Sequence, residues 1–554
     1  MALKKKEIAL LAMLLTAAFL LRVWQAEADP PQGLTFSNGP FSDPGLRSFD
    51  ARNIVLHQAL NPIGPEETPT YMMSPLFTGL LVPTFSFFGT GYVQMRFLSI
   101  LFGVISIAFF YFLSKNLSNQ RVALLSTAFF ALAFPGIFFD RFAFLETFVM
   151  AFLILSLLLW QKGDNSKRPI AFRLSAIISF SLAFLFKPLA FIFIPVLVVA
   201  FLASREHSLN KPSWLQGIGL LAVLGLFLGA VYALMPRFFD MSGSSVPAKF
   251  AFSVVEVARN FALFFANRLF ALTLLISFIA LIAFLVAVIE FCQKRFSMSK
   301  ARLLPASWLL FGAVPLALLS YQPPRYFLFL LPPICLLAAD LFLRMIESKT
   351  FRAKLFSGKL RSLIFVAWLA LFSFSCSIWL NKFFLDTADM AAKLFNVAAS
   401  GFVFFIAGIA IAAILSARKR PLEISAKTKS AIFALVLFAF IASTLVPFVY
   451  WAQSPQYTLV NASRQLALDI PQGSVVMGFP TTWLCLESEL TCVVMYHDFN
   501  DKQPLETFKP THLLVTKGMD DRVLERNYGN WQGLVELVKT YKVGEDKVIL
   551  YRVK

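Results

Sequence analysis

Long apolar segments separated by short polar stretches dominate the chain from its start to about residue 450. A helix needs about 20 mainly apolar residues to cross a bilayer, and about 13 segments come close to that length. The pattern therefore predicts an α-helical polytopic membrane protein. The expected spans are 8–24, 93–113, 121–139, 142–160, 170–186, 188–203, 214–235, 268–290, 302–320, 326–343, 361–380, 396–416 and 430–450.

The pattern changes after residue 451, where short alternating runs replace the long apolar segments. Alternation over four to eight residues is typical of strands at a half-buried sheet face. The sequence predicts strands at 474–479, 492–496, 512–516 and 548–553, and helices at 459–469 and 521–541. We therefore expect two domains, a transmembrane domain at 1–451 and a small soluble α/β domain at 452–554.

Composition and charge distribution agree with a membrane protein and suggest its orientation. The chain has 58% hydrophobic and 15% charged residues, with a net charge of +19, whereas soluble domains carry about 25% charged residues. Its Lys and Arg concentrate in alternate short loops, such as 344–361, while the long loop 25–92 holds only Arg47 and Arg52. The positive-inside rule then predicts a plasma (inner) membrane protein with a cytoplasmic N-terminus and an extracytoplasmic C-terminal domain, and no nucleic-acid partner.

Cys485 and Cys492 lie in the domain that this topology places outside the cytoplasm. Exported compartments favour disulfides, but the spacing leaves open whether these two cysteines pair.

Ionisable groups at or near membrane depth are costly and by default indicate function. Arg and Lys can bind a lipid phosphate through charge-assisted hydrogen bonds, and a nearby carboxylate can accept a proton from an attacking hydroxyl. One base with such cations is enough for inverting sugar transfer, because phosphate is already a good leaving group. The candidates expected on the outer side are Asp50, Asp140-Arg141, Glu146, Lys187 and Arg325-Tyr326.

The order of these features resembles the GT-C membrane glycosyltransferases, specifically the protein O-mannosyltransferase and aminoarabinose transferase superfamily. An acid in the first outer loop is followed there by an aromatic–Pro segment, Phe-Gly, an Arg early in the second span and further charged motifs. The matching positions here are Asp50-Ala51, Tyr71 to Pro75, Phe88-Gly89, Arg96, Arg141 to Glu146, Lys187, and Arg325-Tyr326 with Pro332.

The resemblance implies a role for each candidate. Asp50 would be the catalytic base and Glu146 a second acid that positions donor or acceptor. Arg141, Lys187 and Arg325, with Tyr326, would bind the phosphate of a polyprenyl-phosphate sugar. Met73-Ser74 stands where aminoarabinose transferases carry Glu-Lys, and their zinc-binding histidines have no matching set here. We therefore expect neither a metal nor a cofactor.

The sequence thus predicts an inverting glycosyltransferase that uses a polyprenyl-phosphate sugar donor. Its acceptor would be a lipid-linked glycan, a polysaccharide or a protein at the outer face of the membrane. Two alternatives stay open: a transporter or flippase for a polyprenyl-linked glycan, and a non-catalytic GT-C-like scaffold, since Ala51 replaces the family's second acid. Arg141 and Lys187 could also be interfacial anchors that snorkel to the membrane surface.

Overall fold

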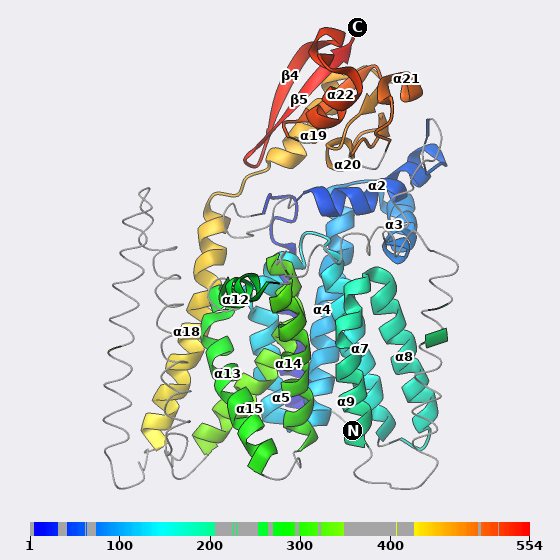
Figure 1. The fold of residues 1–554 in the computed structure, drawn as a ribbon. Helices are drawn as coiled ribbons and strands as arrows, with labels where there is room; N and C mark the ends of the chain where they lie inside the picture. Colours follow the sequence, from blue (N-terminus) through cyan, green and yellow to red (C-terminus); the bar gives the residue numbers. More distant parts are fainter. Residues whose placement is uncertain are drawn as a thin grey trace.

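Helices form a bundle, and a small domain of helices and strands lies at one end of it (Figure 1). We call that end of the bundle the domain end. This computed structural model describes residues 5–30, 41–60, 74–164, 166–204, 253–263, 270–293, 299–319, 323–347, 426–496, 500–518 and 520–554, with a few isolated residues between them.

The bundle supports a multi-pass membrane protein. Six described helices are long and apolar enough to cross a bilayer, namely Tyr92–Leu117, Leu145–Asp164, Pro169–Phe186, Lys300–Leu318, Pro324–Glu347 and Phe433–Asp469. Four shorter apolar helices accompany them, at Pro75–Phe88, Gln120–Leu132, Pro188–Ala203 and Ile276–Cys292. The predicted spans 361–380 and 396–416, and nearly all of 214–235, lie outside the described residues.

The principal bundle helices are α1 (Lys5–Val23), α4 (Tyr92–Leu117), α5 (Gln120–Leu132), α7 (Leu145–Asp164), α8 (Pro169–Phe186), α9 (Ile194–Ser204), α13 (Phe270–Gln293), α14 (Lys300–Leu318), α15 (Leu331–Glu347) and α18 (Ala426–Gln453). Helix α7 is central: 78% of its apolar window is buried, against 17% for the window that includes α18. It packs on α4 and α8 through aromatic contacts, and Phe148 stacks on Phe186 with ring centroids 5.1 Å apart.

Shorter elements cover the domain end of the bundle: α2 (Ser42–His57), α3 (Pro75–Phe88), α6 (Phe134–Phe139), η2 (Pro188–Phe193), α12 (Val254–Leu263) and η6 (Pro324–Leu330). Figure 1 shows α2 lying across this end, between the bundle and the small domain. A buried ion pair fixes α1 here, because Arg22 Nε donates a 2.8 Å hydrogen bond to Asp140 Oδ2. Gly103 makes room for this pair, since a Cβ there would lie 2.5 Å from Asp140 Oδ2.

The small domain contains a five-stranded sheet with the strand order β2-β1-β3-β5-β4. Strand β1 is parallel to β2 and β3, whereas β5 is antiparallel to β3 and β4. The elements are α19 (Thr458–Asp469), β1 (Val475–Met477), α20 (Thr481–Leu484), β2 (Thr491–Val493), α21 (Pro504–Phe508), β3 (His512–Thr516), α22 (Asp520–Tyr528), η8 (Trp531–Leu534), β4 (Val535–Val543) and β5 (Asp546–Val553). The predicted α/β domain is confirmed.

One predicted element of this domain is wrong. The sequence favoured a single helix over 521–541, but the helix ends at Tyr528 and β4 begins at Val535. Gly529 has a φ of 61°, a conformation that glycine adopts without cost and that ends the helix. The following segment contains Val535, Val538 and Tyr541, which favour a strand.

Arg52 of α2 fastens the small domain to the bundle. Its guanidinium is 1% exposed and donates to the carbonyl oxygens of Cys485 at 2.7 Å, Ser488 at 2.6 Å and Leu490 at 2.7 Å. Cys485 and Cys492 form a disulfide, which closes the loop that presents these three carbonyls. The disulfide that the sequence left open is therefore part of the docking surface for α2.

Candidate functional site

Three charged residues predicted from the sequence meet at the domain end of the bundle. Lys187 Nζ lies 2.6 Å from Glu146 Oε1, and Arg325 Nε lies 3.2 Å from the same oxygen. The side chains of Glu146 and Arg325 are 1% and 5% exposed, while that of Lys187 is 15% exposed. One carboxylate oxygen thus accepts from two cations in a largely desolvated place, where charge-assisted bonds are strong.

Local sequence explains why these residues face one another. Glu146 is in the first turn of α7, where the helix dipole favours a carboxylate. Lys187 and Arg325 stand at the starts of η2 and η6, and each of these short helices has a proline at its first position. Proline is preorganised for that position, so both chain segments turn at the domain end and present a cation there.

Tyr326 completes this group. Lys187 Nζ lies 4.6 Å from the centroid of the Tyr326 ring, and Arg325 Cζ lies 5.1 Å from that of Phe144. Aromatic faces attract cations, and these rings hold the two basic side chains in fixed orientations.

Helix α2 adds two residues that the sequence analysis did not select. Asp43 Oδ2 accepts a 2.7 Å bond from Arg325 Nη2, and the Asp43 side chain is 40% exposed. Arg47 interacts electrostatically with Asp43, Glu146 and Arg325. Burial lowers the pKa of Arg47 below its ordinary value, and the two carboxylates oppose that shift. The charge cluster is therefore Asp43, Arg47, Glu146, Lys187 and Arg325, together with the ring of Tyr326.

Asp50, the base expected from the sequence, lies on the same helix about two turns after Asp43 and is 4% exposed. Positions 43, 47 and 50 share one face of a helix because of its 3.6-residue period. That spacing was the sequence feature that could have identified Asp43 and Arg47 as site residues. It was missed because loop 25–92 contains many other acids.

Arg141, predicted to bind phosphate, is placed elsewhere. Its Nη2 donates to the carbonyl oxygens of Trp24 at 2.6 Å and Gln25 at 2.7 Å. Its Cζ lies 4.3 Å from the centroid of the Trp451 ring, so the side chain packs against α18. Among the described residues, the electrostatic partners of Arg141 are Arg96, Arg22 and Tyr457 rather than members of the charge cluster.

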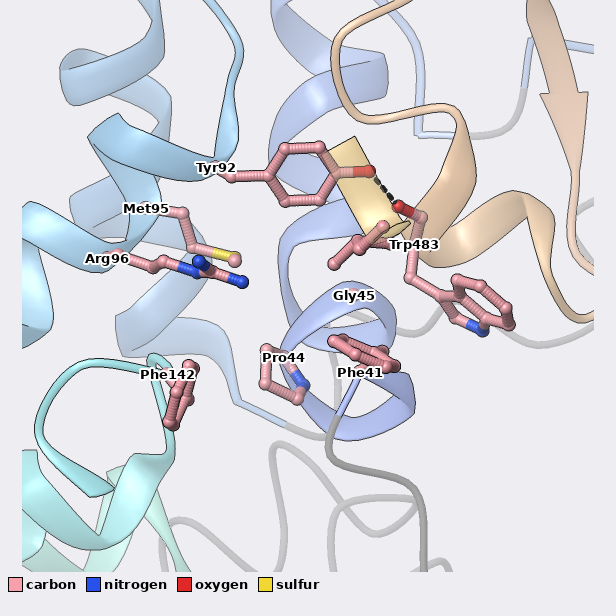
Figure 2. Close-up of a pocket in the computed structure, with 9 residues that line it drawn as sticks. Phe41, Pro44, Gly45, Tyr92, Met95, Arg96, Phe142 and Trp483 are labelled. Atoms are coloured by element: carbon pink, nitrogen blue, oxygen red, sulfur yellow. Dashed lines mark hydrogen bonds between the residues drawn. The ribbon is translucent and has the colours of Figure 1, made fainter. Parts of the chain in front are cut away.

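A narrow pocket adjoins the charge cluster (Figure 2). Arg96 points into it from α4, with Tyr92 and Met95 beside it. Phe41, which precedes α2, and Pro44 in the first turn of α2 form the facing wall. The small domain closes the pocket, because Tyr92 Oη donates a hydrogen bond to the carbonyl oxygen of Trp483. The first turn of α2 is common to the two sites, because Asp43 belongs to the charge cluster and Pro44 lines the pocket.

The described residues contain no group of three or more His, Cys, Asp and Glu side chains that could bind a metal ion. What the charge cluster offers is three cations, two carboxylates and a buried setting. Such a site can bind a phosphate and place a carboxylate beside it.

The chain resembles known membrane glycosyltransferases. A model of the family described as dolichyl-phosphate-mannose-protein mannosyltransferase matches residues 73–232, a segment that includes Arg96, Glu146 and Lys187. No curated protein matches the sequence significantly.

Two solved structures share the fold over nearly the whole chain. The first is ArnT from Cupriavidus metallidurans bound to undecaprenyl phosphate, with 13% identity and a TM-score of 0.55 over 99% of this chain and 97% of that one. The second is AglB, an oligosaccharyltransferase from Archaeoglobus fulgidus in complex with an inhibitory peptide and a dolichol-phosphate. It is 12% identical, with a TM-score of 0.55, over 98% of this chain and 74% of that one. At these identities the likeness shows a shared fold.

Proposed function

We propose that this chain, which has the GT-C fold of membrane glycosyltransferases, is an inverting glycosyltransferase that uses a polyprenyl-phosphate sugar. The observation that carries the proposal is the charge cluster, in which Lys187 and Arg325 share one oxygen of Glu146. Two cations held at the domain end of a membrane bundle suit a lipid-linked phosphate, whose polyprenyl chain remains in the bilayer. The neighbours bound to undecaprenyl phosphate and dolichol-phosphate support the same donor class.

The donor phosphate would bind the N–H groups of Lys187 and Arg325 that Glu146 leaves free. Lys187 and Arg325 would hold the two free phosphate oxygens, and Arg47 would add a third positive charge. With two carboxylates against three cations, the charge cluster has a formal excess of one positive charge, which a phosphate neutralises. Glu146 would then act as a positioning residue that keeps the two cations together.

The reaction needs one proton acceptor. The acceptor oxygen attacks the anomeric carbon of the sugar, the bond from that carbon to the phosphate oxygen breaks, and polyprenyl phosphate leaves with the bonding electrons. A carboxylate takes the acceptor's proton, and attack from the face opposite the phosphate inverts the anomeric carbon.

Two carboxylates of α2 are candidates for this base. Asp43 has the support of its contact with Arg325 and its 40% exposed side chain, so it can reach an acceptor beside the phosphate. Asp50 has the support of its position in the family resemblance, but it is 4% exposed. We propose Asp43 as the base and Asp50 as the alternative. Substitution of each aspartate in turn distinguishes the two.

The topology and acceptor follow as further parts of the proposal. The domain end would face the outside of the plasma (inner) membrane, and the N-terminus the cytoplasm. The acceptor would be a lipid-linked glycan, a polysaccharide or a protein that the small domain helps to position. The small domain rests on α2, which makes it a wall of the site rather than a separate module.

The test uses the full chain in nanodiscs with a panel of radiolabelled polyprenyl-phosphate sugars and envelope glycan acceptors. We expect release of polyprenyl phosphate and an inverted glycosidic bond with one donor, and loss of both when Asp43→Asn and Asp50→Asn are combined. Donor that crosses proteoliposome membranes without cleavage would instead establish the flippase alternative. A chain that binds polyprenyl phosphate but cleaves no donor would establish the scaffold alternative.

A further inference from the structure

The pocket beside the charge cluster holds a buried guanidinium with an open hydrogen-bonding edge. Arg96 is 2% exposed, and its Nη1 donates to the carbonyl oxygens of Ala26 at 2.6 Å and Ala28 at 2.9 Å. Its Nε is buried and has no hydrogen-bond partner among the described residues. The edge formed by Nε and Nη2 is the one with which arginine binds carboxylates and phosphates in a bidentate manner.

The carboxylates near Arg96 are engaged with other groups. Asp29, which acts on Arg96 most strongly among them, accepts from the backbone N–H and hydroxyl of Thr458 at 2.7 and 2.6 Å. Glu27 and Glu487 both bind Arg464, at 3.0 and 3.2 Å. None of these acids forms an ion pair with Arg96 within the part of the chain that the structure describes.

A second buried guanidinium raises the positive potential of this region. Arg141 is fully buried, and its Nε and Nη1 have no hydrogen-bond partner among the described residues. It acts on Arg96 electrostatically, and its ordered contacts are two carbonyls and the Trp451 ring. Two buried guanidinium groups that are not directly ion-paired are costly, so this region favours an anionic ligand at Arg96.

The pocket is joined to the charge cluster through two shared segments. Asp43 contacts Arg325, and the next residue, Pro44, lines the pocket opposite Arg96. Phe144 lies against Arg325, while Phe142, two residues earlier, lies 5.3 Å from Arg96 Cζ. A molecule anchored at Arg96 would therefore lie against the first turn of α2, which also carries Asp43.

We propose that this pocket is the acceptor subsite and binds one oxyanion group, a carboxylate or a phosphate, of an acidic saccharide. The Nε–Nη2 edge of Arg96 binds the oxyanion inside the narrow pocket, beside the rings of Phe41, Tyr92 and Phe142, and the sugar lies at the pocket's opening. Leu459 and Trp483 of the small domain form part of the wall, so the ligand enters from the aqueous side rather than from the lipid. This inference rests on the proposed glycosyltransferase function and specifies its acceptor.

A binding experiment tests the subsite without requiring turnover. The full chain in nanodiscs is titrated with glucuronate, glucose 6-phosphate, inorganic phosphate and neutral glucose, and the thermal unfolding midpoint is recorded. We expect one of the two acidic sugars to raise the midpoint at concentrations about tenfold lower than inorganic phosphate, while glucose has no effect. Equal effects of inorganic phosphate and both sugars would reduce the pocket to a free-anion site and overturn the proposal.

Two variants locate that binding. Arg96→Lys keeps the charge but removes the bidentate edge, and Met95→Phe fills the pocket without changing any charge. We expect each to weaken binding of the acidic sugar about tenfold or more. The matched control is Arg173→Lys at the opposite end of the bundle, where Arg173 pairs with Asp164 at 3.5 Å. Unchanged binding in Met95→Phe would overturn the proposal even if Arg96→Lys fails to fold.

A competition arm separates the acceptor subsite from the donor site. Undecaprenyl phosphate should bind native protein and Met95→Phe with the same affinity; displacement of the acidic sugar by this lipid would overturn the acceptor assignment. In the transfer assay, Met95→Phe should raise the KM for the acidic acceptor about tenfold and leave that for the donor unchanged. Sugar binding without any transfer would contradict the proposed function alone, and transfer only to neutral acceptors would contradict the subsite alone.

Discussion

Lys187 donates a 2.6 Å hydrogen bond to Glu146 Oε1, the same oxygen that accepts from Arg325. A single oxygen that serves two cations leaves each of them with further donors to offer, because a lysine has three N–H groups and an arginine five. The shared contact with Glu146 therefore orients Lys187 and Arg325 and leaves some of their N–H groups available to a ligand. A phosphate that arrives at this place finds its donors already gathered.

Removal of one of these cations should weaken donor binding. Lys187→Gln loses one charge-assisted bond, and we expect the affinity for polyprenyl phosphate to fall about tenfold or more. Equilibrium binding of radiolabelled undecaprenyl phosphate in nanodiscs measures this. Lys300→Gln is the matched control, since Lys300 also pairs with a carboxylate, Asp164 at 3.1 Å, but at the other end of α7. Equal losses in both variants would remove Lys187 from the donor site.

Substitution of the candidate bases should separate Asp43 from Asp50. Asp43→Asn removes a proton acceptor, and we expect kcat to fall by about 10²–10⁴ with little change in donor affinity. Asp50→Asn should have a smaller effect, because that side chain is 4% exposed. The measurement is single-turnover release of polyprenyl phosphate by both variants. The reverse order of effects would make Asp50 the base, as the sequence suggests.

The sequence predicted the parts of the site that depend on where costly charges occur. Glu146, Lys187 and Arg325 stand out in apolar surroundings, and the structure brings them together. The GT-C fold was likewise predicted from the order of motifs and is confirmed. Asp43 lies in a polar loop with several other acids, where one carboxylate does not differ from the next until α2 fixes its direction.

Side-chain directions that depend on backbone turns could not be predicted from the sequence. Arg141 follows Asp140 and precedes a turn in which Ala143 has a φ of 55°, a left-handed conformation that is unusual for alanine. That turn directs Phe142 toward Arg96 and Phe144 toward Arg325. Neither residue spacing nor hydropathy predicts a left-handed turn of this kind.

Opening the disulfide should release α2. Cys485→Ser with Cys492→Ser frees the loop that receives Arg52, and closure of a loop of this length is worth about 2.5 kcal/mol in the chain-entropy model. We expect a lower unfolding midpoint and lower transfer activity, with the same losses when native protein is reduced. Cys292→Ser, at an exposed free cysteine, is the control. Full activity in the double variant would show that the loop holds α2 without its crosslink.

Stability of the small domain should depend on pH through Asp520. Burial raises the pKa of Asp520 to about 7, while the backbone N–H groups of Phe479 and Thr516 oppose that shift. A carboxyl whose folded pKa exceeds its unfolded value favours folding when protonated. Stability should therefore fall as pH rises from about 4 to about 7 and then level off, by on the order of 4 kcal/mol.

Urea titrations of the full chain at several pH values, read by proteolytic cleavage within the small domain, measure this dependence. Asp520→Asn should remove most of the slope between pH 4 and 7, because the amide does not titrate there. A slope that persists in the variant would assign the pH dependence to another group.

The contact between Arg52 and the disulfide loop also constrains the order of events during synthesis and folding of the protein. Arg52 lies near the start of the chain, and its first carbonyl partner follows 433 residues later. A ribosome delivers α2 long before the loop that holds it, and the disulfide of that loop must then still form. Helix α2 is thus secured only in a finished molecule, so we expect nascent or truncated chains to insert into the bilayer without acquiring the proposed transferase activity.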